Sequence, residues 1–249
     1  MGTQRASYNS RLIYILMFFV AFFWGLAWPV GRILATDLLN YPFSVMFLRY
    51  IFAVPVLFGW LWFKEGNVIP LKRDYSYLLL LAFTSVFLYQ VGYMYGMQKT
   101  AASDASLIIG FNPVSVSILS VFILSHNLTR NGVLGILLSF IGVLLIFLAS
   151  PNLDIDFYDR IVGNAYIMLG AFAYAIYVVS MRRYVLLTQH KPLSSLATIS
   201  WASLVGCILF VPFVILEAPW ERIWNNQEWL LIAYLGVLST ALCLSLIHI

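Results

Sequence analysis

Residues 21–32 read AFFWGLAWPVGR and lie inside an apolar run that extends from about residue 12 to residue 35. A helical run of this length can cross a bilayer, because about 20 residues suffice at a rise of 1.5 Å per residue. The stretch also holds Trp24, Trp28 and Pro29. Tryptophan is enriched at membrane interfaces and proline removes a helical hydrogen bond, so these residues indicate more than a passive anchor.

The composition of the whole chain indicates an all-α polytopic membrane protein. Of its 249 residues, 62% are hydrophobic and 10% are charged, whereas a soluble domain has about 45–50% apolar and about 25% charged residues. The net charge of +4 comes from scattered residues, so binding to nucleic acid is not expected. Both cysteines lie in apolar runs and are predicted to be buried thiols. No metal and no cofactor are expected.

Eight apolar runs of spanning length follow one another with short connections between them. They cover residues 12–35, 42–63, 75–98, 104–125, 132–149, 161–182, 193–216 and 228–247. With the N-terminus inside, nine Lys and Arg residues fall in the inside segments and three fall outside, with Arg32 near the outer end of the first span. This excess of inside positive charge predicts a cytoplasmic N-terminus.

Shifting the chain along itself brings separate parts of the sequence into register. AFFWGLAW at residues 21–28 aligns with AFAYAIYV at 171–178, an offset of 150. At an offset of 151, LLAFTSV at 80–86 aligns with LIAYLGV at 231–237. A repeat unit of five spans crosses the membrane an odd number of times, so the second copy starts on the opposite side. The second copy is therefore predicted to be inverted in the membrane, as in many secondary transporters.

The predicted organisation has three parts. A first five-span repeat covers residues 1–149, an outer linker covers 150–160, and an incomplete second repeat of three spans covers 161–249. Only eight of an expected ten spans are then present, so the chain is predicted to be truncated at its C-terminus. The alternative is a protein of eight spans.

Motifs along nearly the whole chain resemble the drug/metabolite transporter superfamily, in its ten-span EamA-type branch. The first span resembles the family's Trp-Gly opening at Trp24 and Gly25, and the second resembles its LRY or LRF motif at Arg49 and Tyr50. The fourth span, with small residues before Pro113, and the fifth span resemble the family as well. The Gly-Glu pair that the family often has before the fifth span is absent, since the chain reads SHN there.

The resemblance implies a small-molecule permease of a bacterial inner membrane. It implies export of amino acids or related metabolites by alternating access of two inverted five-helix repeats. The expected partners are a small-molecule substrate and the lipid bilayer, and a homo-oligomer stays open. Substrate, direction of flux and energy coupling are not set by the sequence.

Polar and aromatic residues near mid-span are the candidate substrate-binding residues. Arg49 lies about 5 Å from the middle of its span, where a charge costs at least ~2.5–3.5 kcal/mol without a partner or water. Its expected partners are backbone carbonyls, Asn112 or Gln90. Pro113 is expected to free the carbonyl of Ile109 for a polar group. The full candidate set is Trp24, Trp28, Arg49, Tyr89, Gln90, Tyr93, Asn112, Tyr174 and Tyr177. For each member, the alternative is ordinary helix packing.

Small residues and Arg32 are expected to serve packing and anchoring. Gly25 and Gly31 are predicted to let neighbouring helices approach the first span, and Gly135 and Gly142 to do so on one face of the fifth span. Arg32 is predicted to snorkel toward the outer headgroups rather than bind a solute.

Three alternatives to an exporter of amino acids or related metabolites are a carrier of phosphorylated sugars, an enzyme and a chain that does not transport. A nucleotide-sugar or sugar-phosphate carrier would need several buried cations for its phosphates, and only Arg49 lies at depth. An enzyme is not expected, because no histidine or acid lies deep in a span to act as a base or metal ligand. A non-transporting fragment or a membrane scaffold is the third alternative.

Overall fold

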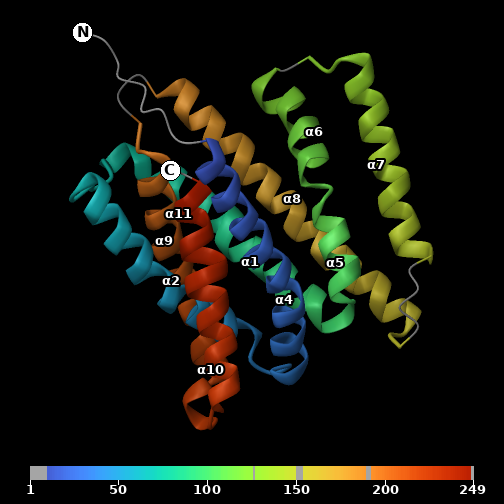
Figure 1. Ribbon diagram of the computed structural model, residues 1–249, viewed down its shortest axis with the longest axis vertical. Coiled ribbons are helices and arrows are strands. Elements are labelled where there is room, and N and C mark those ends of the chain that lie inside the picture. Colours follow the sequence, from blue (N-terminus) through green and yellow to red (C-terminus); the bar gives the residue numbers. More distant parts are fainter. Residues whose placement is uncertain (1–9, 126, 150–153, 189–191, 248–249) are drawn as a thin grey trace.

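The computed structural model describes residues 10–125, 127–149, 154–188 and 192–247. These residues form helices joined by short connections (Figure 1). Eight helical segments are long and apolar enough to cross a membrane, which confirms the predicted all-α polytopic class. Five spans are continuous helices: α1 (Ser10–Asp37), α2 (Pro42–Glu65), α7 (Arg130–Ala149), α8 (Phe157–Leu187) and α9 (Ser195–Glu217). Helix α8 begins before residue 161, so residues 157–160 of the predicted linker are helical.

The other three spans are interrupted near their middles. The third consists of η1 (Lys72–Asp74), α3 (Tyr75–Ala82), η2 (Phe83–Leu88) and α4 (Tyr89–Lys99). The fourth consists of α5 (Ala102–Ile109) and α6 (Asn112–Leu124). A short turn, η3 (Pro219–Glu221), precedes the eighth span, which consists of α10 (Asn226–Ala233), η4 (Tyr234–Leu242) and α11 (Cys243–Ile247).

The break in the fourth span follows from its proline. Pro113 has no N–H to bond the carbonyl of Ile109. The two residues between the helices, Gly110 and Phe111, instead make tight turn bonds to the carbonyls of Leu107 and Ile108. Helix α1, by contrast, continues through Pro29 without interruption.

The third and eighth spans share a π-helical segment. Segment η2 begins at Phe83 and η4 begins at Tyr234, which lie 151 residues apart (234 − 83 = 151), the same offset at which the two sequences align. π-Helical turns are rare and often occur at functional sites, because they change which side chains face a neighbouring helix.

The centre of the bundle is formed by two close helix pairs, α2 with α9 and α4 with α8. Glycines set the distance between α4 and α8. A Cβ on Gly92 would lie 2.6 Å from the carbonyl oxygen of Tyr166, and one on Gly163 would lie 2.7 Å from the backbone nitrogen of Thr100. Backbone therefore packs directly on backbone, a contact that only glycine permits.

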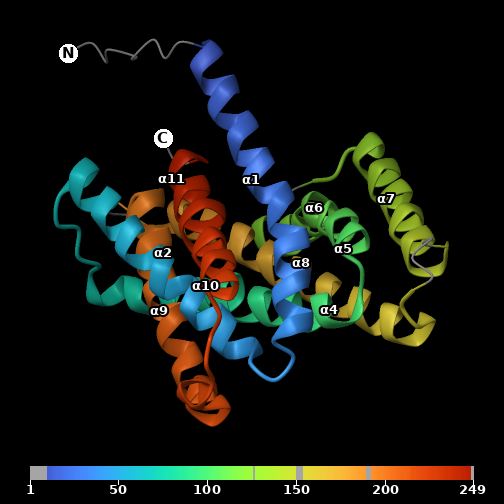
Figure 2. The ribbon, with the colours of Figure 1, turned by 60° about the horizontal axis from the view of Figure 1, so that its bottom comes forward.

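Helix α7 lies at the edge of the bundle in both views of the ribbon (Figures 1 and 2). None of its described side chains is buried. Apart from the helix's own neighbouring backbone, no atom of the described residues lies within 4 Å of a Cβ placed on Gly135 or on Gly142, and the same holds for Gly25 in α1. The predictions that these three glycines allow close helix contact are therefore wrong for this structure.

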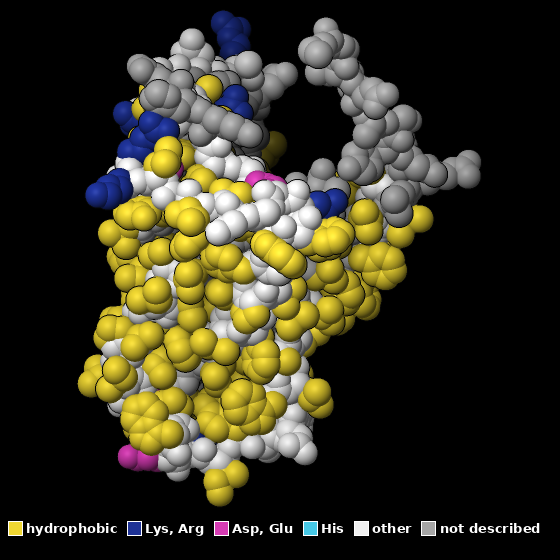
Figure 3. All heavy atoms as spheres, turned by 90° about the vertical axis from the view of Figure 1, so that its left-hand side faces the viewer, with side chains coloured by type: hydrophobic (Ala, Val, Ile, Leu, Met, Phe, Trp, Pro, Cys, Tyr) yellow, Lys and Arg dark blue, Asp and Glu magenta, His cyan; other side chains and the backbone are white. Residues whose placement is uncertain are grey.

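The outer surface of the bundle matches a membrane environment. Hydrophobic side chains cover most of the visible face, and Lys and Arg side chains gather toward one end of it (Figure 3). Large apolar residues such as Leu138, Phe122 and Leu216 are between 68% and 83% exposed. Apolar exposure of this extent fits contact with lipid rather than water.

The glycine contacts of α4 predict the effect of a single added methyl group. We expect Gly92→Ala to lower stability by about 1–3 kcal/mol, because the new Cβ meets backbone atoms that cannot rotate away. Gly135→Ala on α7 is the matched control and should leave the thermal midpoint unchanged or slightly higher, since its Cβ meets nothing within 4 Å. Thermal unfolding of the detergent-purified variants measures both, and equal midpoints would contradict the packing described.

Candidate functional site

A cavity of about 420 Å³ lies inside the bundle, a size typical of small-molecule sites. Every span except α7 contributes residues to its wall. All nine residues singled out in the sequence line it: Trp24, Trp28, Arg49, Tyr89, Gln90, Tyr93, Asn112, Tyr174 and Tyr177. The structure thus brings the candidate set to one place, and solute binding by them stays a prediction.

Aromatic rings from α1, α2, α4 and α8 form a large part of the cavity wall. The ring centroids of Trp28 and Tyr93 lie 5.4 Å apart. On the α8 side, Tyr174 lies 5.6 Å from Tyr89 and 5.5 Å from Tyr177. Tilted ring pairs of this kind contribute stabilising energy in addition to that from burying their surface, and they favour fixed ring orientations.

Trp24 lines the cavity from α1 and contacts η4. Its indole Nε1 donates a hydrogen bond of 3.0 Å to the carbonyl oxygen of Ser239 in η4. Trp24 aligns with Tyr174 in the sequence repeat, and both side chains line the same cavity. The indole is 39% exposed, so part of the ring stays free to meet a solute or lipid.

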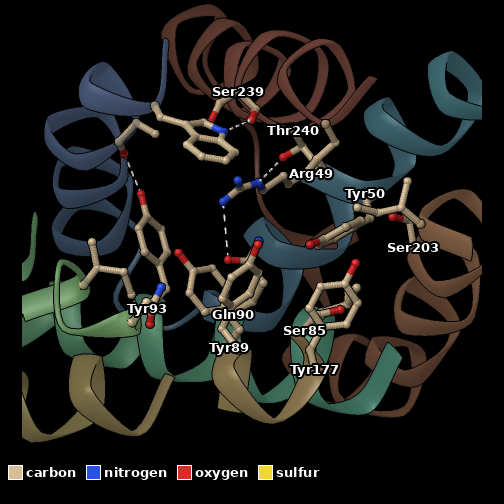
Figure 4. Close-up of a pocket in the computed structure, with 18 of the residues that line it drawn as sticks. Arg49, Tyr50, Ser85, Tyr89, Gln90, Tyr93, Tyr177, Ser203, Ser239 and Thr240 are labelled. Carbon is tan, nitrogen blue, oxygen red and sulfur yellow. Dashed lines mark hydrogen bonds between the residues drawn. The ribbon is translucent and has the colours of Figure 1, made fainter. Parts of the chain in front are cut away.

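Arg49 extends into the cavity from α2 (Figure 4). Its Nε donates to Oγ1 of Thr240 at 2.8 Å, and its Nη1 donates to Oε1 of Gln90 at 3.4 Å. The guanidinium carbon also lies 5.8 Å from the ring centroid of Tyr93, within the range of a cation–π attraction. Gln90 was predicted as a partner and is confirmed. The other two expected alternatives, Asn112 and a backbone carbonyl, are not among the hydrogen-bond partners of Arg49 in the described part of the chain.

Thr240 was not anticipated from the sequence, and its place depends on the π-helical segment. Its hydroxyl donates to the carbonyl oxygen of Leu235, five residues earlier, at 2.7 Å while it accepts from Arg49. A Cβ on Gly236 would lie 2.5 Å from the carbonyl oxygen of Arg49. The close approach at Gly236 therefore brings η4 against α2 and lets the threonine reach the arginine.

Arg49 is the only side chain with a full charge among the described residues that line the cavity. Its two hydrogen-bond partners, Thr240 and Gln90, are neutral. The ion pairs of Lys99 with Asp159 and of Arg222 with Glu228 lie outside the cavity wall. Within the described part of the chain, the cavity consequently has one positive charge without a charged partner.

The broken fourth span adds hydrogen-bond acceptors to the cavity. Asn112 lies beside Pro113 in the wall, and its side-chain oxygen is buried without a hydrogen-bond partner in the described part of the chain. The hydroxyls of Tyr89, Tyr174 and Tyr177 also lack such a partner there, so each can bind a polar group of a solute.

The sequence profile of the EamA-like transporter family matches residues 11–148 and again residues 161–248. The chain belongs to the EamA-like transporter family. It is similar to the uncharacterized transporter YetK of Bacillus subtilis, with 30% identity over 172 residues, which are 69% of this chain and 51% of the relative. It is also similar to an uncharacterized transporter of Archaeoglobus fulgidus, with 26% identity over 200 residues, 80% of this chain and 66% of the relative. The chain spans about half to two thirds of the length of these relatives. Its family is one of transporters, not of enzymes.

Three predicted residues of this EamA-like chain have structural roles at the α1–α4 contact. The hydroxyl of Tyr93 donates to the carbonyl oxygen of Ala27 at 2.5 Å. A Cβ on Gly31 would overlap that hydroxyl at 1.7 Å, so the predicted close approach at Gly31 is confirmed. Arg32 does not snorkel, because its Nη1 donates to the carbonyl oxygen of Met97 at the end of α4.

The two cavity tyrosines of α4 predict a contrast in stability. Tyr93→Phe removes a buried hydrogen bond and should cost about 0.5–1.5 kcal/mol. Tyr89→Phe, the matched control, removes a hydroxyl that has no partner among the described residues and should change stability little. Thermal unfolding in detergent distinguishes them, and an equal loss in both variants would contradict the assigned role of Tyr93.

Proposed function

We propose that this chain forms the core of a small-molecule permease that exports amino acids or related metabolites across a bacterial inner membrane. The main support for this function is the cavity at mid-bundle, whose wall contains residues from both segments that match the EamA-like family. Its aromatic wall with few polar groups suits an amphipathic metabolite. The class of solute and the direction of export rest on the family resemblance.

The mechanism that we propose is alternating access, in which two inverted halves, residues 1–149 and 161–249, move about the cavity. Polar contacts between the halves support it. Glu217 at the end of α9 accepts hydrogen bonds from the backbone N–H groups of Phe43 and Ser44, at 2.8 and 2.6 Å. Lys99 of α4 pairs with Asp159 of α8 at 2.6 Å. A rocking motion would break and re-form such contacts.

A sugar-phosphate carrier is a weaker candidate. Phosphate groups carry up to two negative charges and are bound by several Lys or Arg side chains in low-dielectric sites. Arg49 is the only cation among the described residues lining the cavity. A single cation leaves the second charge of a phosphate unpaired.

Filling the cavity should stop transport. Cells that express the complete reading frame containing this chain, with the 249-residue form beside it, would be assayed for efflux of an amino-acid and organic-acid panel. In Ser203→Trp the new ring occupies the cavity, because Ser203 lines it and is buried, and efflux should fall to background. Gly142→Trp adds the same ring on α7, where a Cβ meets nothing within 4 Å, and efflux should persist. No efflux of any panel member above empty cells would contradict the proposed function.

We also propose that the N-terminus is cytoplasmic, and single cysteines test this. In a background with Cys207→Ala and Cys243→Ala, Glu221→Cys should react with a membrane-impermeant maleimide on intact cells. Asn67→Cys, in the connection after α2, should react only after the cells are permeabilised. The reverse pattern would show the opposite orientation.

A further inference from the structure

The chemistry of the guanidinium group narrows the class of solute. Arginine has five N–H donors, and two hydrogen bonds are accounted for by Thr240 and Gln90. The remaining three, both on Nη2 and one on Nη1, have no partner among the described residues. Arg49 is only partly buried and Nη2 is not among the buried unpaired atoms. These donors therefore lie open to the cavity.

Nη1 and Nη2 form the end-on edge of the guanidinium plane, and three of their four N–H groups have no partner among the described residues. An edge of two parallel N–H groups matches the two oxygens of a carboxylate, which gives a bidentate, charge-assisted pair. Thr240 holds the group through Nε and Gln90 holds it through Nη1 (Figure 4), so its orientation is set before a solute arrives. A preorganised group loses little side-chain freedom on binding.

Charge balance limits the solute to one negative charge. The described residues of the cavity wall carry a single cation and no Asp or Glu. A monoanion would neutralise this charge, whereas a dianion would bring a second charge without a partner into a low-dielectric site. A neutral solute would leave the guanidinium as it is.

The aromatic wall determines the rest of the solute. Trp28 and Tyr93 lie on one side, and Tyr89, Tyr174 and Tyr177 lie together on another. Ring faces and edges pack well on a planar or branched apolar group. A cavity of about 420 Å³ has room for a small metabolite of this kind.

We propose that the transported solute is an organic monocarboxylate with an aromatic or branched apolar body, and that Arg49 binds its carboxylate through Nη1 and Nη2. This inference rests on the proposed function, because it assigns the solute class of the same cavity. It covers acids that have no ammonium group. It also covers amino acids with an apolar side chain, whose ammonium group would have to be held by neutral acceptors of the wall such as the side-chain oxygen of Asn112, which has no hydrogen-bond partner in the described part of the chain.

Binding of matched acids and amides tests the inference. The purified chain in lipid nanodiscs is titrated by calorimetry with 3-phenylpropionate, 3-phenylpropionamide, 4-methylpentanoate, 4-methylpentanamide and 2-phenylethyl phosphate. We expect each acid to bind about tenfold or more tightly than its amide, and the phosphate to bind more weakly than the acid of similar shape, because only the acids satisfy both the charge and the edge geometry.

Variants locate the carboxylate. Arg49→Gln should remove the preference for acid over amide, and Arg49→Lys should keep the charge but lose part of the preference with the bidentate edge. Arg182→Gln is the matched control, because Arg182 is exposed at the far end of α8 and does not line the cavity. It should bind the acids as the unmodified chain does. The acid–amide comparison on the unmodified chain decides the charge preference even if an Arg49 variant does not fold.

The outcomes separate this inference from the proposed function. Acids and amides that bind equally, or a preference that survives in folded Arg49→Gln, would overturn the inference alone. Efflux of other solutes without binding of either acid would do the same. If the efflux panel also detects no solute, the proposed function falls and the inference falls with it.

Discussion

A guanidinium group held inside a membrane-spanning bundle is the constraint on which the rest of the site depends. A charge at this depth is costly unless polar groups or water surround it. Arg49 donates hydrogen bonds to a hydroxyl of η4 and to an amide oxygen of α4, and it lies against the ring of Tyr93. Arg49 and Gln90 lie in the first family-matched segment and Thr240 lies in the second. The same interactions that stabilise the charge therefore join the two segments around the cavity.

The backbone of the bundle is shaped to allow these contacts. Gly236 brings η4 against α2, and Gly92 and Gly163 bring α4 against α8. The π-helical segments η2 and η4 place Ser85 and Thr240 in the cavity wall. The glycine contacts and the π-helical segments both position side chains, and both weaken or interrupt regular α-helix. Such departures are common where a site is built within helices.

The sequence predicted the spans and the candidate set better than it predicted contacts between helices. Length and hydropathy suffice to predict the spans. Polar and aromatic residues at mid-span avoid the lipid and therefore face the interior that the helices share. All nine candidates accordingly line one cavity. Thr240 was missed because a π-helical turn shifts which side chains face inward, and ordinary helical spacing does not reveal such a turn.

The failures at Gly135, Gly142 and Arg32 have a similar origin. Spacing shows that Gly135 and Gly142 share a face, but it does not show whether another helix covers that face, and α7 lies at the edge (Figure 2). Arg32 sits near a helix end, where snorkelling is the usual outcome. The carbonyl of Met97 is a partner that only the folded chain brings within reach.

Thiol labelling inside the cavity tests most directly whether one uncompensated positive charge governs it. Ser203→Cys in a background with Cys207→Ala and Cys243→Ala would be reacted with anionic and cationic methanethiosulfonates of similar size. The rate of each reagent with the Ser203→Cys variant is divided by its rate with a free thiol in solution. We expect this ratio to be about threefold higher for the anionic reagent than for the cationic one, because the field of Arg49 raises the local concentration of the anion. The advantage should disappear with Arg49→Gln. Equal relative rates for the two reagents, or faster reaction with the cationic one, would contradict the central role of this charge.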